Sequence, residues 1–144
     1  MCTANRCRSP MAEGLISSRA TATGAPVEVL SAGTWAVDGV PATENARIVM
    51  AERGIDIEGH VSREVDAGLV VMADLILVMT QGHKEALEAD FPAAAGKTLL
   101  MSALAGGRWD VADPVEGDLD EYRATADALA QLVASGWARI VGTE

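Results

Sequence analysis

The chain has 144 residues, of which 49% are hydrophobic, so residues 1–144 can form one domain that buries a core without a disulfide or metal. Its net charge of −10, from 21 acidic and 11 basic residues, argues against a nucleic-acid partner. The longest apolar run, residues 68–80, is too short to cross a bilayer, and the N-terminus has no signal-peptide pattern. We therefore expect a cytoplasmic protein that binds neither nucleic acid nor membranes.

The first predicted element is a loop at the N-terminus. In the segment CTANRCRS, Cys2 is followed six residues later by Arg8. Five intervening residues allow the backbone to curl once, so that successive N–H groups point at one centre, and arginine adds a planar, two-pronged donor. This pattern predicts a loop that binds phosphate, or another tetrahedral oxyanion, beside a nucleophilic thiol.

The loop is expected to lead into a helix over residues 10–22. We expect Ser9 to cap this helix, Pro10 to lie in its first turn and Glu13 to interact favourably with its dipole. The N-terminus of a helix stabilises negative charge, so its place beside Cys2 favours the thiolate.

The rest of the chain alternates helical and strand patterns. Helical periodicity predicts four more helices, over residues 41–53, 63–71, 81–90 and 119–140. Apolar or β-branched runs between them predict strands, over residues 27–31, 74–79 and 97–101. Such alternation is typical of an α/β fold with a parallel sheet covered on both faces.

The string CTANRCRSPMAEGL closely resembles the signature of the low-molecular-weight protein-tyrosine phosphatases. The resemblance continues through residues 30–34, 59–63, 73–79 and 113–114, in the family's order, and so covers almost the whole chain. It implies a doubly wound three-layer sandwich with a parallel sheet of order 2-1-3-4. It also implies a monomer or weak dimer that hydrolyses phosphoprotein monoesters through a phosphocysteine intermediate, without metal or cofactor.

Three residues are expected to carry out the chemistry. Cys2 would attack phosphorus, and Arg8 would hold two phosphoryl oxygens and strengthen that grip in the transition state. Asp113, followed by Pro114, matches the family's mobile acid loop. It would protonate the leaving atom and then activate water.

The predicted phosphate-binding and loop-supporting residues are Thr3, Ala4, Asn5, Arg6, Cys7, Ser9, Ser31 and His60. The resemblance implies a left-handed Asn5 whose amide braces the loop, which asparagine tolerates better than most residues. It also implies that the Ser9 hydroxyl helps the sulfur leave. Ser31 and His60 would extend the brace, and we assign His60 support rather than proton transfer.

The substrate stays open between phosphotyrosine and phosphoarginine. Val115 and Glu116 stand where eukaryotic members have two tyrosines that flank an aromatic substrate. Other stretches, including the one around Tyr122, look closer to bacterial protein-arginine phosphatases, which have a threonine at the position of Arg6. A cation there disfavours a guanidinium, so we favour phosphotyrosine.

Two further functions are weighed. An arsenate reductase uses a related loop but needs more cysteines, and none exists beyond Cys7. An inactive phosphate-binding regulatory module is the non-enzymatic alternative. The closeness of Cys2 and Cys7 permits a reversible disulfide, so we expect redox regulation.

One departure from the family concerns the start of the sheet. The family has a hydrophobic strand before its nucleophile, whereas only Met1 precedes Cys2 here. Without this first, central strand, we expect its two neighbours to lack a shared partner and the loop to lack an anchor. We therefore expect that an active product begins upstream of Met1 with a short hydrophobic strand.

Overall fold

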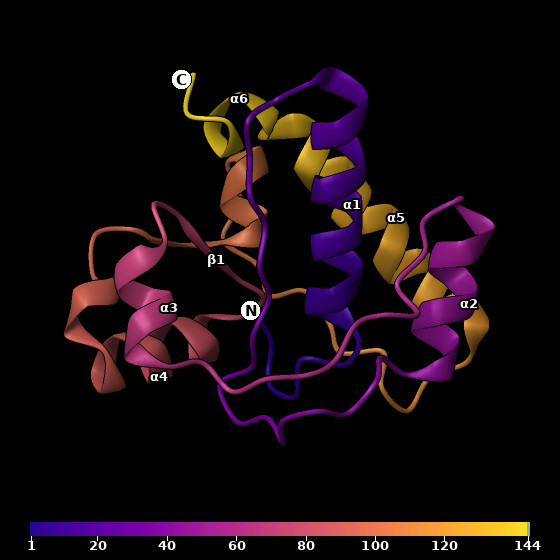
Figure 1. Cartoon of the computed structure of the whole chain (residues 1–144), viewed down its shortest axis with the longest axis horizontal. Helices are drawn as coiled ribbons and strands as arrows, with labels where there is room; N and C mark the ends of the chain where they lie inside the picture. Colours follow the sequence, from indigo (N-terminus) through magenta and orange to yellow (C-terminus); the bar gives the residue numbers. More distant parts are fainter. Residues whose placement is uncertain (144) are drawn as a thin grey trace.

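The computed structural model describes residues 1–143. In chain order its elements are α1 (Arg8–Thr23), α2 (Glu44–Glu52), α3 (Ala67–Met72), β1 (Ile76–Val78), α4 (Gln81–Asp90), the 3-10 helix η1 (Pro92–Ala94), β2 (Thr98–Leu100), the 3-10 helix η2 (Met101–Ala105), α5 (Leu119–Ser135) and α6 (Trp137–Ile140). Figure 1 shows α1 and α5 on one side of β1, and α3 and α4 on the other.

The side chains of β1 alternate between these two layers. Ile76 and Val78 are buried in a cluster with Val70 of α3 and Leu87 of α4. Leu77 packs against the larger cluster, which includes buried side chains of α1, α2 and α5. A short strand with apolar residues on both faces is what an α/β fold with a covered parallel sheet requires.

The regular sheet is smaller than predicted. β1 and β2 pair in parallel, with Ile76 opposite Thr98 and Val78 opposite Leu100. Residues 27–31 do not form the expected strand, and Gly33 instead makes isolated parallel bridges to Cys2 and Glu64. A strand forms only where ladder hydrogen bonds exist, and within residues 1–143 no strand pairs with residues 27–31. The four-strand order 2-1-3-4 therefore stays a prediction.

The first residues nevertheless follow the sheet. The Met1 ammonium donates to the Leu77 carbonyl (2.5 Å), and the Met79 amide donates to the Met1 carbonyl (3.1 Å). On the other side of this N-terminal segment, facing away from β1, the Thr34 amide donates to the Cys2 carbonyl (2.9 Å). Figure 1 shows the N-terminus in the middle of the molecule, beside β1. The expectation that the loop lacks an anchor is therefore wrong.

Several helix boundaries differ from the prediction for local reasons. The second helix begins only at Glu44, because Pro41 makes an antiparallel bridge to Val61. The third begins only at Ala67, after Asp66, whose carboxylate accepts from the Leu69 amide.

The predicted helix over residues 119–140 is divided at Gly136 into α5 and α6. A Cβ at Gly136 would lie 2.5 Å from the Cβ of Leu104, so this close approach needs glycine.

Two helices match their predictions more closely. α4 spans the predicted residues 81–90, and the Thr80 hydroxyl caps it by accepting from the His83 amide. α1 covers residues 10–22 but begins at Arg8. Among residues 1–143, no helix is long and apolar enough to cross a membrane.

Candidate active site

The predicted phosphate loop occupies residues 2–7 and runs directly into α1. Cys7 stands at the N-cap position, and no side chain caps the helix. The prediction that Ser9 caps it is therefore wrong, because Ser9 lies inside the first turn and its hydroxyl is used elsewhere. Pro10 lies in the first turn as predicted, whereas Glu13 lies beyond that turn and accepts a hydrogen bond from Ser31.

Cys2 begins a chain of buried polar contacts. Its sulfur lies 3.0 Å from the Ser9 hydroxyl oxygen, and the Asn5 side-chain amide donates to that same oxygen (2.8 Å). Since Asn5 supplies a proton to Ser9, the Ser9 proton is available for the Cys2 sulfur. A hydroxyl that donates to sulfur stabilises the thiolate form.

Asn5 holds the loop in place from the inside. It is fully buried and has a φ of 59°, so its predicted left-handed conformation is confirmed. Its side-chain oxygen accepts from the Arg63 amide (3.0 Å), and its side-chain amide also donates to the Ser31 hydroxyl (2.9 Å). The His60 Nε2 donates to the Asn5 carbonyl (2.7 Å), which fixes the proton on that nitrogen.

Arg8 joins the loop to the segment that contains Asp113. Its side chain is buried, and Nη1 donates to the Val111 carbonyl at 2.8 Å. Nη2 lies 3.3 Å from a carboxylate oxygen of Asp113, whose side chain is 44% exposed. Two residues that are 105 positions apart in the sequence therefore meet at the start of α1. The buried Arg8 Nε has no partner within residues 1–143.

His83 is a site residue that the sequence analysis missed. Its Nε2 lies 2.8 Å from the Thr3 hydroxyl oxygen, and burial lowers the pKa of His83 to about 4, with the nearby Arg8 charge acting in the same direction. The imidazole is therefore neutral near pH 7. The signal that could have found it is position, because His83 follows the Thr80 cap at the start of a helix after β1.

Cys7 points away from this centre, toward α5. Its sulfur lies 3.4 Å from the Tyr122 hydroxyl and 3.7 Å from that of Thr43, which donates to the Tyr122 oxygen. Burial raises the pKa of Cys7, so its thiol stays protonated at neutral pH. Tyr122, in the first turn of α5, thus anchors the loop on its outer side.

The remaining loop residues lie at the surface. Ala4 is exposed, and the partly exposed Arg6 donates through Nε to the Pro41 carbonyl (3.0 Å). The Arg6 carbonyl accepts from the Thr43 amide (2.9 Å). In the part of the chain that the structure describes, no three His, Cys, Asp or Glu side chains gather as metal ligands.

Comparisons with known proteins agree with this geometry. The profile of the low molecular weight phosphotyrosine protein phosphatases matches residues 1–142. The chain belongs to this family. It is 39% identical to the protein-arginine-phosphatase of Bacillus subtilis over 134 residues, which cover 92% of this chain and 89% of the relative.

A tyrosine phosphatase and a solved structure are similarly close. The chain is 36% identical to the probable low molecular weight protein-tyrosine-phosphatase EpsP of Ralstonia nicotianae, across 97% of this chain and 92% of that protein. The crystal structure of a low molecular weight protein tyrosine phosphatase from T. tengcongensis superposes with a TM-score of 0.92 at 37% identity. That match covers 96% of this chain and 95% of the other.

Proposed function

We propose that the chain hydrolyses phosphotyrosine in proteins through a phosphocysteine intermediate. The observation that carries this proposal is the contact of the Cys2 sulfur with the Ser9 hydroxyl at the start of α1, where Arg8 also meets Asp113. A nucleophile, a hydroxyl to assist sulfur departure, a cation and a carboxyl group are thus assembled around one loop.

The reaction divides into two steps. The Cys2 thiolate attacks phosphorus, the bond from phosphorus to the ester oxygen breaks, and Asp113 gives its proton to that oxygen. Water then attacks the phosphocysteine, Asp113 takes the water proton, and the sulfur leaves as a thiolate. The Ser9 hydroxyl, whose oxygen lies 3.0 Å from the Cys2 sulfur, stabilises that sulfur in both its attacking and its leaving roles.

Arg8 has donors to spare for the phosphoryl group. The guanidinium carries five N–H donors, of which those on Val111 and Asp113 occupy two. Phosphoryl oxygens gain negative charge in the transition state, so a planar cation beside the loop binds that state more strongly than the ground state.

The choice of phosphotyrosine rests on Arg6. Its partly exposed side chain lies over Pro41, beside the loop, where its charge repels the guanidinium of a phosphoarginine substrate. Protein-arginine phosphatase is the second candidate, because relatives of that name match the chain as closely as the tyrosine phosphatases do.

The test replaces Cys2 by Ser and compares it with Cys7→Ser, the same chemical change five residues along the loop. We expect Cys2→Ser to abolish turnover of p-nitrophenyl phosphate while vanadate or phosphate still binds, and Cys7→Ser to keep measurable turnover. Undiminished activity in Cys2→Ser would exclude the nucleophile. Phosphotyrosine and phosphoarginine peptides, assayed side by side on the parent chain, decide the substrate through their kcat/KM values.

Redox control and a cytoplasmic location complete the proposal. Cys2 and Cys7 are both free thiols, buried in one loop, which suits a reducing compartment. For an oxidised Cys2 to condense with Cys7, the Cys7 side chain must turn away from Tyr122 and Thr43, and a thiol reductant then restores both thiols.

A further inference from the structure

The helices α1, α2 and α5 pack against one another (Figure 1). A surface groove of about 470 Å³ lies where they meet. None of the residues that line this groove belongs to the phosphate loop. They are Leu15, Ser18, Arg19 and Ala22 of α1, Arg53 and Ile55 beyond the end of α2, and Ala130 and Val133 of α5.

The floor of the groove is apolar. Leu15 and Val133 are buried in the core, and Ile55 and Ala130 are half-buried against it. The lining side chains of Ala22 and Ala130 are small, so α1 and α5 leave room between them. An aliphatic ligand chain on this floor would be removed from water in the same way as a core side chain.

Two arginines mark the ends of the groove. Nη1 of Arg53 donates to the Asp127 carboxylate (2.7 Å), and the guanidinium carbon of Arg19 lies over the Trp137 ring, 5.1 Å from its centroid. Asp127 lies within α5, and Trp137 follows the C-terminal end of that helix. An α-helix rises about 1.5 Å per residue, so the stretch from Asp127 to the end of α5 separates the two contacts by on the order of 12 Å.

The two arginines differ in how their charge is compensated. The charge of Arg53 is paired with Asp127, whereas Arg19 forms no ion pair with a carboxylate of residues 1–143. Contact with the Trp137 ring stabilises a cation without neutralising it, and it leaves the edges of the guanidinium free to donate. A guanidinium binds both oxygens of a carboxylate through two parallel N–H bonds. The Arg19 end of the groove therefore offers a place for a carboxylate.

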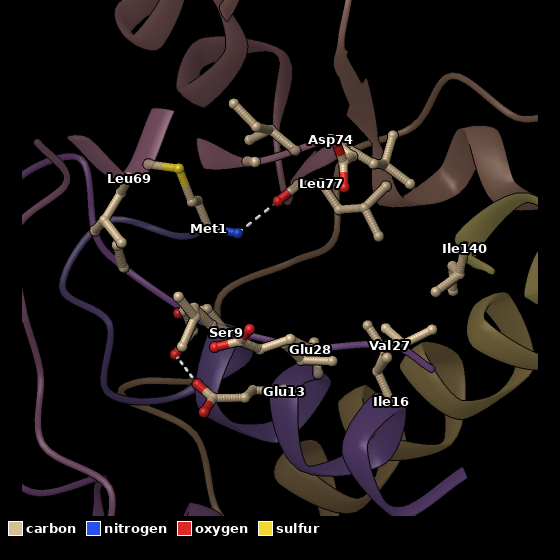
Figure 2. A pocket seen from close by; sticks show the side chains of 18 of the residues that line it. Met1, Ser9, Glu13, Ile16, Val27, Glu28, Leu69, Asp74, Leu77 and Ile140 are labelled. Carbon is tan, nitrogen blue, oxygen red and sulfur yellow. Dashed lines mark hydrogen bonds between the residues drawn. The ribbon is translucent and has the colours of Figure 1, made fainter. Parts of the chain in front are cut away.

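The charge of the groove is opposite to that of the molecule. The chain has a net charge of −10, yet two of the eight described residues that line the groove are arginines and none of the eight is acidic. A larger cavity of about 750 Å³, between residues 27–32 and β1, has Glu13, Glu28 and Asp74 among its lining side chains (Figure 2). An anion with an apolar tail is therefore attracted to the groove and disfavoured in the larger cavity.

We propose that this groove binds a free, unbranched aliphatic carboxylate, that is, a medium-chain fatty acid. The carboxylate bonds to Arg19, and the chain lies on the apolar floor toward Arg53. An extended chain advances about 1.2 Å per bond, as a polypeptide backbone does, so about ten carbons fill a groove of about 12 Å. Arg53 closes the other end without competing for the carboxylate, because it is already paired with Asp127.

The experiment is calorimetric titration of the chain with decanoate at about 0.15 M salt. Decanol, which has the same chain without the charge, and decyltrimethylammonium, which has the opposite charge, are titrated for comparison. Arg19→Gln removes the cation, and Ala130→Leu fills the floor of the groove. Arg108→Gln is the matched control, because Arg108 is exposed and lies outside the groove. Circular dichroism establishes that each variant is folded.

We expect decanoate to bind one site per chain with a Kd below about 1 mM. Each methylene added between hexanoate and decanoate should tighten binding by about twofold to fourfold, as expected for a chain that lies on an apolar floor. Arg19→Gln should weaken binding by about tenfold or more, because charge-assisted hydrogen bonds are lost. Ala130→Leu should weaken it to a similar extent, and Arg108→Gln should change it by less than about twofold, because salt screens a distant exposed charge.

Three results would overturn the proposal. These are no saturable binding up to about 1 mM decanoate, decanol binding as tightly as decanoate, and unchanged binding in either groove variant. If decanoate does not bind but Ala130→Leu changes the sedimentation coefficient, the groove joins two copies of the chain instead.

Inorganic phosphate separates the groove from the phosphate loop. Saturating phosphate should leave decanoate binding unchanged, whereas competition would place the carboxylate in the loop and also overturn the proposal. None of these titrations uses turnover, so their failure and a failure of the proposed phosphatase function are distinguishable.

Discussion

At the scale of single residues, the loop depends on one asparagine in an unusual conformation. Asn5 takes a positive φ that costs most residues about 1 kcal/mol or more, and its side chain bonds to Ser9, Ser31 and the Arg63 amide at once. No other standard side chain combines a left-handed preference with both a donor and an acceptor at this length. The same contacts orient the hydroxyl that lies on the Cys2 sulfur.

The residue that couples this loop to acid catalysis is Asp113. Replacing it by Asn removes the proton donor but keeps the size and the contact with Arg8. We expect kcat to fall by about a hundredfold or more on phenyl phosphate, whose leaving group needs a proton, and by less on p-nitrophenyl phosphate. Steady-state kinetics on the two esters measures the difference.

Asp110 supplies a matched control for Asp113. It lies three residues earlier and accepts from the Gln81 amide rather than from Arg8. Asp110→Asn should leave the ratio of the two rates unchanged. An Asp113→Asn enzyme with the same ratio as the parent would place the proton donor elsewhere.

At the scale of elements, sequence patterns predicted those whose stability is local. The Thr80 cap and the helical period define α4 at both ends, and the apolar run around Ile76 defines β1. Residues 27–31 have a strand pattern but need partners on both sides, which periodicity does not report. The prediction that Ser9 caps α1 failed for a similar reason. The sequence shows the residue type but not that its hydroxyl contacts Cys2 and Asn5.

The N-terminus of α4 yields a test of the residue that sequence reasoning missed. His83→Ala removes the hydrogen bond to Thr3, and we expect kcat/KM to fall by about threefold to tenfold, the range that one lost hydrogen bond accounts for. His83→Gln keeps a neutral side chain that can bond to Thr3 and should recover most of the loss.

The His83 side chain is neutral near pH 7, because its pKa lies at about 4. The pH profile of kcat/KM above pH 5 should therefore have the same shape in the parent and in His83→Gln. A limb near pH 6 to 7 that disappears in His83→Gln would instead make His83 a titrating group of the reaction.

At the scale of the whole molecule, four buried groups contribute to how stability depends on pH. Burial lowers the pKa of His83 to about 4 and that of the Met1 ammonium to about 6, from ordinary values of 6.5 and 8.0. Burial also raises the pKa of the Cys7 thiol, and it raises that of Tyr122 to about 12. Protonation of the first two groups favours the unfolded chain in acid, and deprotonation of the last two favours the unfolded chain in base.

The directions of these pKa changes predict a maximum in the free energy of unfolding as a function of pH. Between pH 4 and 6.5 the unfolded chain holds more protons on His83, and between pH 6 and 8 it holds more on Met1, so the free energy of unfolding rises with pH across both windows. Above pH 9 the unfolded chain loses protons from Cys7 and Tyr122 that the folded chain keeps, so the free energy of unfolding falls as the pH rises further. We expect the free energy of unfolding in urea to increase from pH 4 to about pH 8.

The Met1 contribution can be isolated, because it depends on one amine. The groups that interact with this ammonium are Cys2 and Glu13, which raise its pKa, and Arg8, which lowers it. Lowering this pKa from 8.0 to about 6 corresponds to on the order of 3 kcal/mol, which should appear as a rise in unfolding free energy between pH 6 and 8. Acetylation of the Met1 nitrogen removes the proton-binding group, so that rise should vanish, while His83→Gln should flatten only the window below pH 6.5. A parent chain whose unfolding free energy is constant or falls between pH 6 and 8 would show that the ammonium is as well solvated in the folded state as in the unfolded one.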